Sequence, residues 1–201
     1  RFQDTRHPSR LNPSTPARPS YEVKRVRSGP PQAQARSFTG EALDWRYLYE
    51  RFGPELSAFA YRLTADEEVA KDLVQDTFVK AIRRQATLAD HSAVRAWLYR
   101  IAANVVMDWR RRRALLSFVP FVGSEQAPER SSDTAALVRQ ALRSIPAAQA
   151  VALVLTYHEG FSRSEVAAML GVPEETVKTR IARGRKSFEA SYLRLQRGLA
   201  G

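Results

Sequence analysis

Basic and hydroxyl side chains gather in one segment near the C-terminus of this 201-residue chain. They are Thr176, Lys178, Thr179, Arg180, Arg183, Arg185 and Lys186, and no acidic residue interrupts them. Such side chains donate hydrogen bonds to phosphate oxygens and to base edges, so the segment is suited to binding DNA. Lys178, Thr179 and Arg183 lie at spacings that share a helical face, and we assign them to bases. The others, apart from Arg180, are better placed for phosphates.

The residues before this segment predict a helix-turn-helix. Ser162 and Glu165 have the spacing of a capping box. Ala167 is small where two helices must cross closely, and Gly171 falls at the turn, where a positive φ is needed. The small core would be completed by Val166, Leu170, Val172, Val177 and Ile181. Many such units have an apolar residue at the position of Arg180, and we expect Ile181 to take that role. The alternative is a plain helical hairpin with a solvated basic face.

Two other clusters lie in the N-terminal half. Asp72, Gln75, Asp76 and Val79 fall on one helical stripe and form an acidic patch on a basic protein. The second cluster, residues 95–113, mixes aromatic side chains with arginines, which bind phosphate while rings stack on bases. The acidic patch is also compatible with an ordinary solvated surface, and Trp97 in the second cluster is better explained as a core residue.

Residues able to do bond chemistry are scarce. The histidines are His7, His91 and His158, and only His158 adjoins an acid, Glu159. Without a paired-carboxylate or metal-ligand pattern, the sequence predicts no catalytic residues, no metal and no cofactor. A nucleic-acid hydrolase is therefore a weak alternative, which a metal-dependence assay would test.

Helical periodicity dominates the chain, so the predicted fold class is all-α, with two small helical domains joined by an extended linker. The first predicted helix carries Trp45, Leu48, Phe52, Leu56, Phe59 and Leu63, with Gly53-Pro54 expected to kink or split it. Thr64 to Glu67 has the form of a capping box that opens a second helix, which fades near Arg83. A polar loop, 86–91, leads to a third helix at about 92–113.

The predicted boundaries are a basic disordered tail at 1–38, a first domain at 41–114, a linker at 115–133 and a second domain at 134–197. The linker begins with apolar residues that lack a helical period, so we expect it to lie against something. Short helices at about 134–145 and 151–155 precede the helix-turn-helix, whose helices should span about 162–170 and 174–196.

Composition sets the class of partner. The net charge of +11 and the isoelectric point near 10.5 favour a polyanion, either nucleic acid or an anionic membrane surface. The chain has no cysteine, and its longest apolar stretch is shorter than the roughly 20 residues of a membrane span.

Three segments in order carry a resemblance: Tyr61 to Thr64, Asp72 to Phe78 and Arg95 to Ala102, followed by the helix-turn-helix. Together they resemble the extracytoplasmic-function (ECF) sigma factors, the smallest members of the sigma-70 family. The resemblance covers about residues 41–196 and implies a transcription-initiation factor that carries core RNA polymerase to a promoter and helps to open it.

The resemblance also implies roles for residues. Docking on the polymerase β′ clamp helices would involve Asp72, Leu73, Gln75, Asp76 and Phe78. The −10 element would be read and melted by Arg100, Asn104, Asp108, Trp109, Arg110, Arg111 and Arg112, with a flipped base captured by the loop at 84–93. The linker would thread toward the polymerase active site, and the second domain would sit on the β flap and read the −35 element.

An anti-sigma factor and a cytoplasmic location, on the nucleoid when the protein is active, are further implications of the resemblance. The main alternative is a conventional helix-turn-helix repressor or activator, which should dimerise and bind a palindrome without polymerase. The sequence offers no clear dimerisation helix, and this alternative leaves the first domain unexplained.

Overall fold

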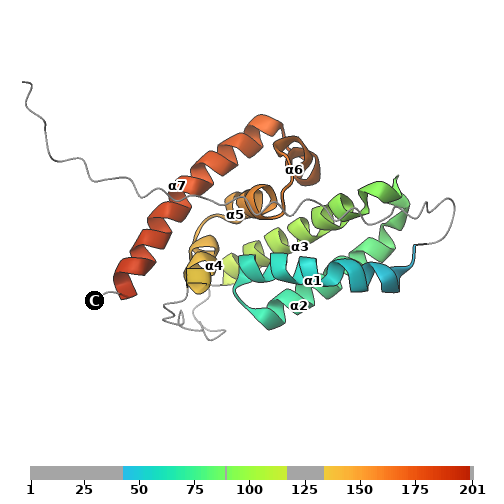
Figure 1. Cartoon of the computed structure of the whole chain (residues 1–201), viewed down its shortest axis with the longest axis horizontal. Coiled ribbons are helices and arrows are strands. Elements are labelled where there is room, and N and C mark those ends of the chain that lie inside the picture. Colours follow the sequence, from blue (N-terminus) through green and yellow to red (C-terminus); the bar gives the residue numbers. More distant parts are fainter. Residues whose placement is uncertain (1–42, 89, 117–133, 200–201) are drawn as a thin grey trace, which may run out of the picture. The chain divides into compact units, whose positions relative to one another are not determined.

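The computed structural model describes residues 43–88, 90–116 and 134–199, and every regular element in them is a helix (Figure 1). The all-α prediction is therefore confirmed. The predicted tail at 1–38 and residues 117–133 of the predicted linker lie outside the described residues. We call α1 to α3 the N-terminal module and α4 to α7 the C-terminal module.

The N-terminal module contains three long helices and two short 3₁₀ turns. Its elements are α1 (Trp45–Thr64), α2 (Glu67–Arg83), η1 (Gln85–Thr87), η2 (His91–Ala93) and α3 (Val94–Leu116). Leu115 and Leu116, which the sequence placed in the linker, are the last residues of α3, so that part of the prediction is wrong. Leu115 is 65% exposed, which explains why it adds nothing to the buried periodic stripe.

Pro54 lies inside α1 and does not split it. Proline removes one backbone donor and crowds the preceding turn, which is why the sequence favoured a kink or a break. The helix continues because Phe52 and Leu56, on either side of Pro54, are both buried in the core. The Asp44 side chain caps the start of α1 by accepting a hydrogen bond of 3.0 Å from the Tyr47 backbone N–H.

The capping box predicted from Thr64 to Glu67 is wrong in its cap residue. Thr64 ends α1, and its buried hydroxyl donates back to the Ala60 carbonyl at 3.0 Å. The cap of α2 is Asp66, whose carboxylate accepts from the Val69 N–H at 3.1 Å. Between the helices Ala65 adopts a left-handed φ of 55°, which makes the turn short.

The two 3₁₀ turns η1 and η2 lie at the two ends of the loop predicted at 86–91, and η1 is bonded to α3. The Trp97 indole Nε1 donates to the Thr87 hydroxyl at 3.1 Å, and the Trp97 side chain is buried. Trp97 is thus a core residue, as expected, and it fixes the path of the chain between α2 and α3.

The C-terminal module consists of α4 (Thr134–Ser144), α5 (Ala147–Leu153), η3 (Val154–His158), α6 (Arg163–Leu170) and α7 (Glu174–Leu199). The helices predicted at about 134–145, 162–170 and 174–196 are confirmed, whereas α5 begins four residues before the helix predicted at about 151–155. Residues 154–158, which follow α5 directly, form one turn of π-helix. Such turns are rare and are often associated with function.

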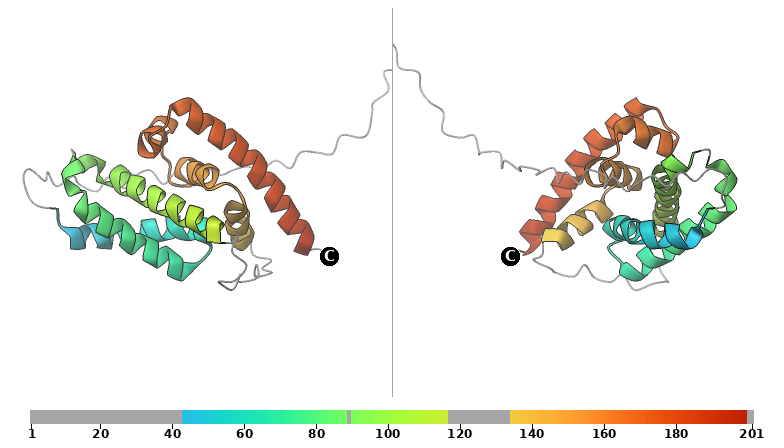
Figure 2. Two further views of the ribbon diagram at one scale, coloured as in Figure 1. Left: turned by 180° about the vertical axis from the view of Figure 1, so that it is seen from behind. Right: turned by 45° about the vertical axis from the view of Figure 1, so that its right-hand side comes forward.

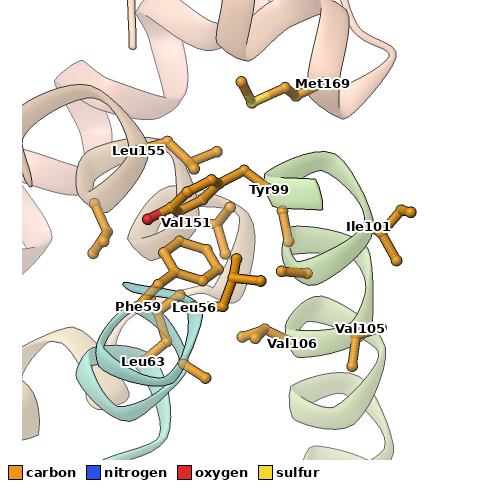
Figure 3. Packing of buried hydrophobic residues seen from close by; sticks show 14 of the residues in the cluster. Leu56, Phe59, Leu63, Tyr99, Ile101, Val105, Val106, Val151, Leu155 and Met169 are labelled. Atoms are coloured by element: carbon orange, nitrogen blue, oxygen red, sulfur yellow. The ribbon is translucent and has the colours of Figure 1, made fainter. Parts of the chain in front are cut away.

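One apolar cluster includes buried residues of both modules. Figure 3 shows Leu56 and Phe59 of α1, Tyr99 and Val106 of α3, and Val151 and Leu155 turned toward one another. The Phe59 and Tyr99 rings meet edge to face, with centroids 5.4 Å apart. In Figure 2, α3 runs beside α5 and α6 as well as α2, so α3 belongs to both halves of the core.

Candidate nucleic-acid interface

The helix-turn-helix is built by local hydrogen bonds. The Ser162 hydroxyl accepts from the Glu165 N–H at 3.2 Å, and the Glu165 carboxylate accepts from the Ser162 N–H at 2.8 Å. These hydrogen bonds lower the pKa of Glu165 below its ordinary value, so it remains an anion near the start of α6. Gly171 ends α6 with a φ of 63° and donates its N–H to the Ala167 carbonyl. The predicted cap and turn are confirmed.

One face of α7 is exposed and basic. Val177, Ile181 and Gly184 are buried and recur at spacings of four and three. The exposed candidates are Lys178, Thr179, Arg183, Arg185 and Lys186, while Thr176 and Arg180 are half-buried. Ile181 takes the core position, as expected. Thr179, Arg183 and Lys186 also recur at spacings of four and three, so Lys186 shares the exposed face of Thr179 and Arg183.

Ion pairs on this surface are weak and replaceable. The Lys178 ammonium lies 3.2 Å from the Glu175 carboxylate, and both side chains are mostly exposed. The Arg163 guanidinium lies 3.7 Å from Glu174 with similar exposure. Exposed pairs of this kind contribute about 0–1 kcal/mol, so Lys178 and Arg163 can exchange these partners for phosphate at little cost.

Gly184 lets α7 pack closely against α5, a contact that no sequence motif predicted. A Cβ at this position would lie 3.1 Å from Leu153 Cδ1 and 3.2 Å from Gln149 Cβ. The glycine therefore lets α7 approach α5 closely, which fixes the helix behind its basic face. A glycine in the middle of a long basic helix is the one signal that pointed to such a contact.

A polar stripe runs along α3. Arg100, Asn104, Asp108 and Arg111 recur at spacings of four, four and three, and all are exposed except Asn104, which is half-buried. Asp108 and Arg111 form an exposed ion pair of 3.4 Å. Arg112 is also exposed. Hence four of the seven residues predicted to read DNA from this helix are exposed, and Asn104 shares their stripe.

The other two residues of that set, Trp109 and Arg110, lie elsewhere. Trp109 is half-buried against the apolar cluster, and the Arg113 guanidinium lies 5.5 Å from its ring centroid. Arg110 donates to three carbonyls at the end of α4: Arg143 at 2.8 Å, Ile145 at 2.6 Å and Leu142 at 3.3 Å. Burial lowers the pKa of Arg110 to about 10, so it is still a cation at neutral pH.

The acidic patch lies on α2. Asp72, Gln75 and Asp76 are exposed, and Val79 is 45% exposed on the same stripe. Ile82, one turn further along α2, is 44% exposed and extends the patch. Leu73 and Phe78 are buried in the core, so they position the stripe and do not form its surface.

Within the described ranges, no helix is both long and apolar enough to cross a membrane. The same residues hold no group of three or more potential metal ligands.

Comparison with known families assigns both modules. The model of Sigma-70 region 2 matches residues 48–115, and that of Sigma-70, region 4 matches residues 135–188. An all-helical chain that has both regions in this order is a sigma factor. This chain belongs to the sigma-70 family, in its ECF group.

Its relatives agree over most of their length. The chain is 31% identical to ECF RNA polymerase sigma factor SigL of Mycobacterium tuberculosis over 149 residues, which are 70% of this chain and 84% of SigL. It is also 31% identical to RNA polymerase sigma factor YlaC of Bacillus subtilis over 148 residues, 69% of this chain and 86% of YlaC.

Two solved structures are similar. One is the sigma factor RpoE in complex with the anti-sigma factor NepR from Bartonella quintana, at 30% identity and a TM-score of 0.58 over 74% of this chain and 96% of RpoE. The other is CnrH in complex with the cytosolic domain of CnrY, at 31% identity and a TM-score of 0.51 over 73% and 85%. As a sigma factor, the chain binds RNA polymerase and directs it to promoters, and the independent repressor or activator is not favoured.

Proposed function

We propose that the three surfaces divide the work of promoter recognition. The exposed basic face of α7 reads the −35 element, the polar stripe of α3 binds and melts the −10 element, and the acidic stripe of α2 docks on the polymerase. The observation that carries this proposal is the exposed face of Thr179, Arg183 and Lys186 on a capped helix-turn-helix.

At the −35 element, α7 would lie in the major groove. Arg183 and Lys178 have the donors that guanine O6 and N7 accept, and the Thr179 hydroxyl and methyl can meet either hydrogen-bonding groups or a thymine methyl. Thr176 and Arg185 lie beside this face and would hold phosphates, which set the register of the helix on the duplex. Arg180, half-buried, would contact phosphate only from the edge of the groove.

At the −10 element, α3 would act on single-stranded DNA. Arg100 and Arg111 would hold the backbone of the non-template strand, while Asn104 offers an amide that both donates to and accepts from a base edge. Unstacking a base costs a few kcal/mol, which binding of the freed strand offsets. The segment from Arg84 to Ala93 would receive the flipped base. Binding of this kind shifts the closed-to-open equilibrium and breaks no covalent bond.

On the polymerase, the α2 stripe would meet a basic surface on the β′ clamp helices. Asp72 and Asp76 would supply the charge and Val79 and Ile82 the apolar contact, with Leu73 and Phe78 holding the helix from below. The C-terminal module would sit on the β flap. We keep 41–114 and 134–197 as the proposed domains, the first extended to Leu116, with the intervening chain crossing the polymerase.

We propose an anti-sigma partner because both similar structures are complexes: RpoE was solved with NepR, and CnrH was solved with the cytosolic domain of CnrY. The acidic α2 stripe is a candidate surface for such a partner, because covering it would prevent docking on the polymerase. We place the active protein in the cytoplasm, on the nucleoid.

Run-off transcription tests the proposal. Core polymerase is combined with this chain on a library of promoter fragments, and transcripts with defined start sites should appear only when the chain is present. DNA binding should fall with salt by about 0.9 log units for each phosphate neutralised. Absence of transcripts together with tight binding of a palindrome by the chain alone would overturn the proposal.

A further inference from the structure

Glu159 is a buried acid whose partners come largely from the N-terminal module. Its side chain is only 8% exposed. The Tyr99 hydroxyl of α3 donates to its carboxylate at 2.7 Å, and the Arg62 guanidinium of α1 donates at 3.4 Å. Arg95 of α3 approaches the same carboxylate at 3.7 Å and donates to the Glu159 carbonyl at 3.3 Å. Only His158 approaches it from its own module, at 3.4 Å.

Arg110 makes the reciprocal contact at the other end of α3. It belongs to the N-terminal module and is satisfied by three carbonyls of the C-terminal module, at the end of α4 and just beyond it. Those carbonyls have no intrahelical partner, and a cation at a helix C-terminus is favoured by the helix dipole. Each module therefore presents one charged side chain, the buried Glu159 or the half-buried Arg110, that groups of the other module neutralise or solvate.

Both contacts fall on one stripe of α3. Arg95, Tyr99, Ala103, Val106 and Arg110 recur at spacings of four, four, three and four. Ala103 and Val106 in the middle are buried, and Figure 3 shows Tyr99 and Val106 facing the side from which Phe59 and Val151 approach. This stripe differs from the exposed stripe of Arg100, Asn104, Asp108 and Arg111, so α3 has one face for closure and another for DNA.

Aromatic and cation–π contacts surround the groups that bind Glu159. The Arg95 guanidinium lies 4.8 Å from the Tyr99 ring centroid and 4.6 Å from that of Phe161, and the two rings are 5.1 Å apart. At the α1 side, Arg139 of α4 lies 4.8 Å from the Tyr61 ring centroid. Burial and the neighbouring Glu159 charge raise the pKa of Tyr99, so its hydroxyl keeps the proton that it donates.

We propose that the contacts of Glu159 and Arg110 form a latch that holds the two modules together in the polymerase-free protein, and that Arg110 is withheld from DNA until the latch opens. The role of Arg110 at DNA rests on the proposed function, whereas the closure itself does not. The partner that this face of the C-terminal module fits is thus the chain's own α3.

The small size of the closed chain means that the two modules must separate on a promoter. A compact chain of about 160 residues has a radius of gyration of about 15 Å. Elements centred about 25 base pairs apart on B-form DNA are separated by about 85 Å, at roughly 3.4 Å per base pair. A closed unit cannot bind both elements at once, so the modules must separate on the promoter, which exposes Arg110 at the moment when the −10 strand is engaged.

Single-molecule energy transfer between two engineered cysteines tests the latch. The chain has no cysteine of its own, so Tyr47→Cys in α1 and Ala190→Cys in α7, both exposed and outside the proposed binding surfaces, give one label on each module. The full-length, polymerase-free protein should show mainly a high-transfer population. Glu159→Gln removes the buried charge but keeps the side-chain shape, and it should raise the ratio of open to closed molecules by about tenfold.

Two further variants keep the test interpretable. Tyr99→Phe removes only the hydroxyl, so it should raise the open population several-fold even if Glu159→Gln lowers the helical circular dichroism. Glu50→Gln breaks an exposed ion pair within α1, between Arg46 and Glu50, and should change nothing. A wild type that is already open, or latch variants that match Glu50→Gln, would overturn the latch.

Adding core polymerase separates this inference from the proposed function. Conversion of the wild type to the low-transfer population, together with run-off transcripts, supports both. Unchanged transfer and no transcripts, with Glu159→Gln still open in free solution, would reject the polymerase role and leave the latch standing.

Discussion

Helices α7 and α3 are the two long basic helices of this sigma factor, and they differ in how much of their surface is free. On α7 the buried positions Val177, Ile181 and Gly184 occupy one side, and the basic residues around Thr179 lie opposite. On α3 the apolar cluster surrounds most of the helix, and the exposed residues lie on the stripe from Arg100 to Arg111 or at the end of the helix, residues 112–115. Under the proposed function, α7 is a DNA-binding helix that the core supports on its opposite side, and α3 is a core helix with one DNA-binding face.

The polar contacts of the two helices differ in range. Lys178 of α7 pairs with Glu175, one turn away. Tyr99 and Arg110 of α3 bind groups 60 and about 33 residues away along the chain. Local pairs leave a surface available, whereas long-range pairs tie it to another part of the fold. A basic residue on a helix proposed to bind DNA can therefore contact DNA only if tertiary packing leaves its side chain exposed.

The largest expected effect is on polymerase binding by the acidic stripe of α2, which belongs neither to the proposed DNA-binding faces nor to the latch. Asp76→Arg should weaken binding to core polymerase by about a hundredfold or more, because like charges would meet at the interface. Binding is measured by fluorescence anisotropy, with the helical circular dichroism unchanged. Glu189→Arg, an exposed reversal on α7, is the control. Normal binding by Asp76→Arg would mean that the stripe is ordinary surface.

The shared core gives the next largest effect. Phe59→Ala should lower the free energy of unfolding by about 3–5 kcal/mol, since the ring is fully buried between the modules. Urea denaturation followed at two wavelengths should show one transition. Phe188→Ala, half-buried on α7, should cost much less. Two separate transitions in the wild type would contradict a common core.

Base recognition by α7 comes third. Arg183→Ala or Lys178→Ala should weaken binding by about 1–3 kcal/mol at particular base pairs of the −35 element. Arg185→Ala should instead weaken binding about equally on all sequences. The comparison is made by electrophoretic mobility shift on a panel of single-base variants. If all three variants lost affinity equally on every sequence, the exposed face of α7 would make phosphate contacts only.

The turn of the helix-turn-helix predicts a smaller change. Gly171→Ala should destabilise the fold by about 1 kcal/mol, because a φ of 63° is strained for a residue with a Cβ. The space around Gly171 is open, so the cost comes from the backbone and not from a clash. Gly198→Ala in α7, also in open space, should be neutral or slightly stabilising in thermal denaturation.

The smallest expected effect is a pH dependence at the latch. Burial first, and then the Arg62 charge, lower the pKa of His158 below its ordinary value of 6.5, against the opposing Glu159 charge. The open or unfolded chain therefore binds the proton more tightly, and the closed form loses stability as pH falls from about 6.5.

The groups that face His158 and the adjoining carboxylate are Arg62 of α1, together with Arg95 and Tyr99 of α3. Thermal denaturation at about pH 7.5 and pH 5.5 measures the decline. His158→Gln should make that decline shallower. An identical decline in the variant would show that other groups cause it.

Most elements of the fold were predictable because their signals are local. The helical stripe of Leu56, Phe59 and Leu63, and the capping pair Ser162 and Glu165, predict helices whose bounds the structure bears out within a few residues. Errors arose where local rules compete. Pro54 was expected to break a helix that core burial keeps intact, and Thr64 was taken as a cap although its hydroxyl is bonded to Ala60.

The helices, the helix-turn-helix and the basic residues of α7 can be predicted from the sequence, because each depends on spacings within a few helical turns. Only the tertiary structure shows that Arg110 and Glu159 are bonded to the opposite module and that Gly184 lets α5 approach α7 closely. It also shows that the apolar residues of both modules form one cluster. The physical reason is range: periodicity records which side chains share a face, whereas only the folded chain determines what each face meets.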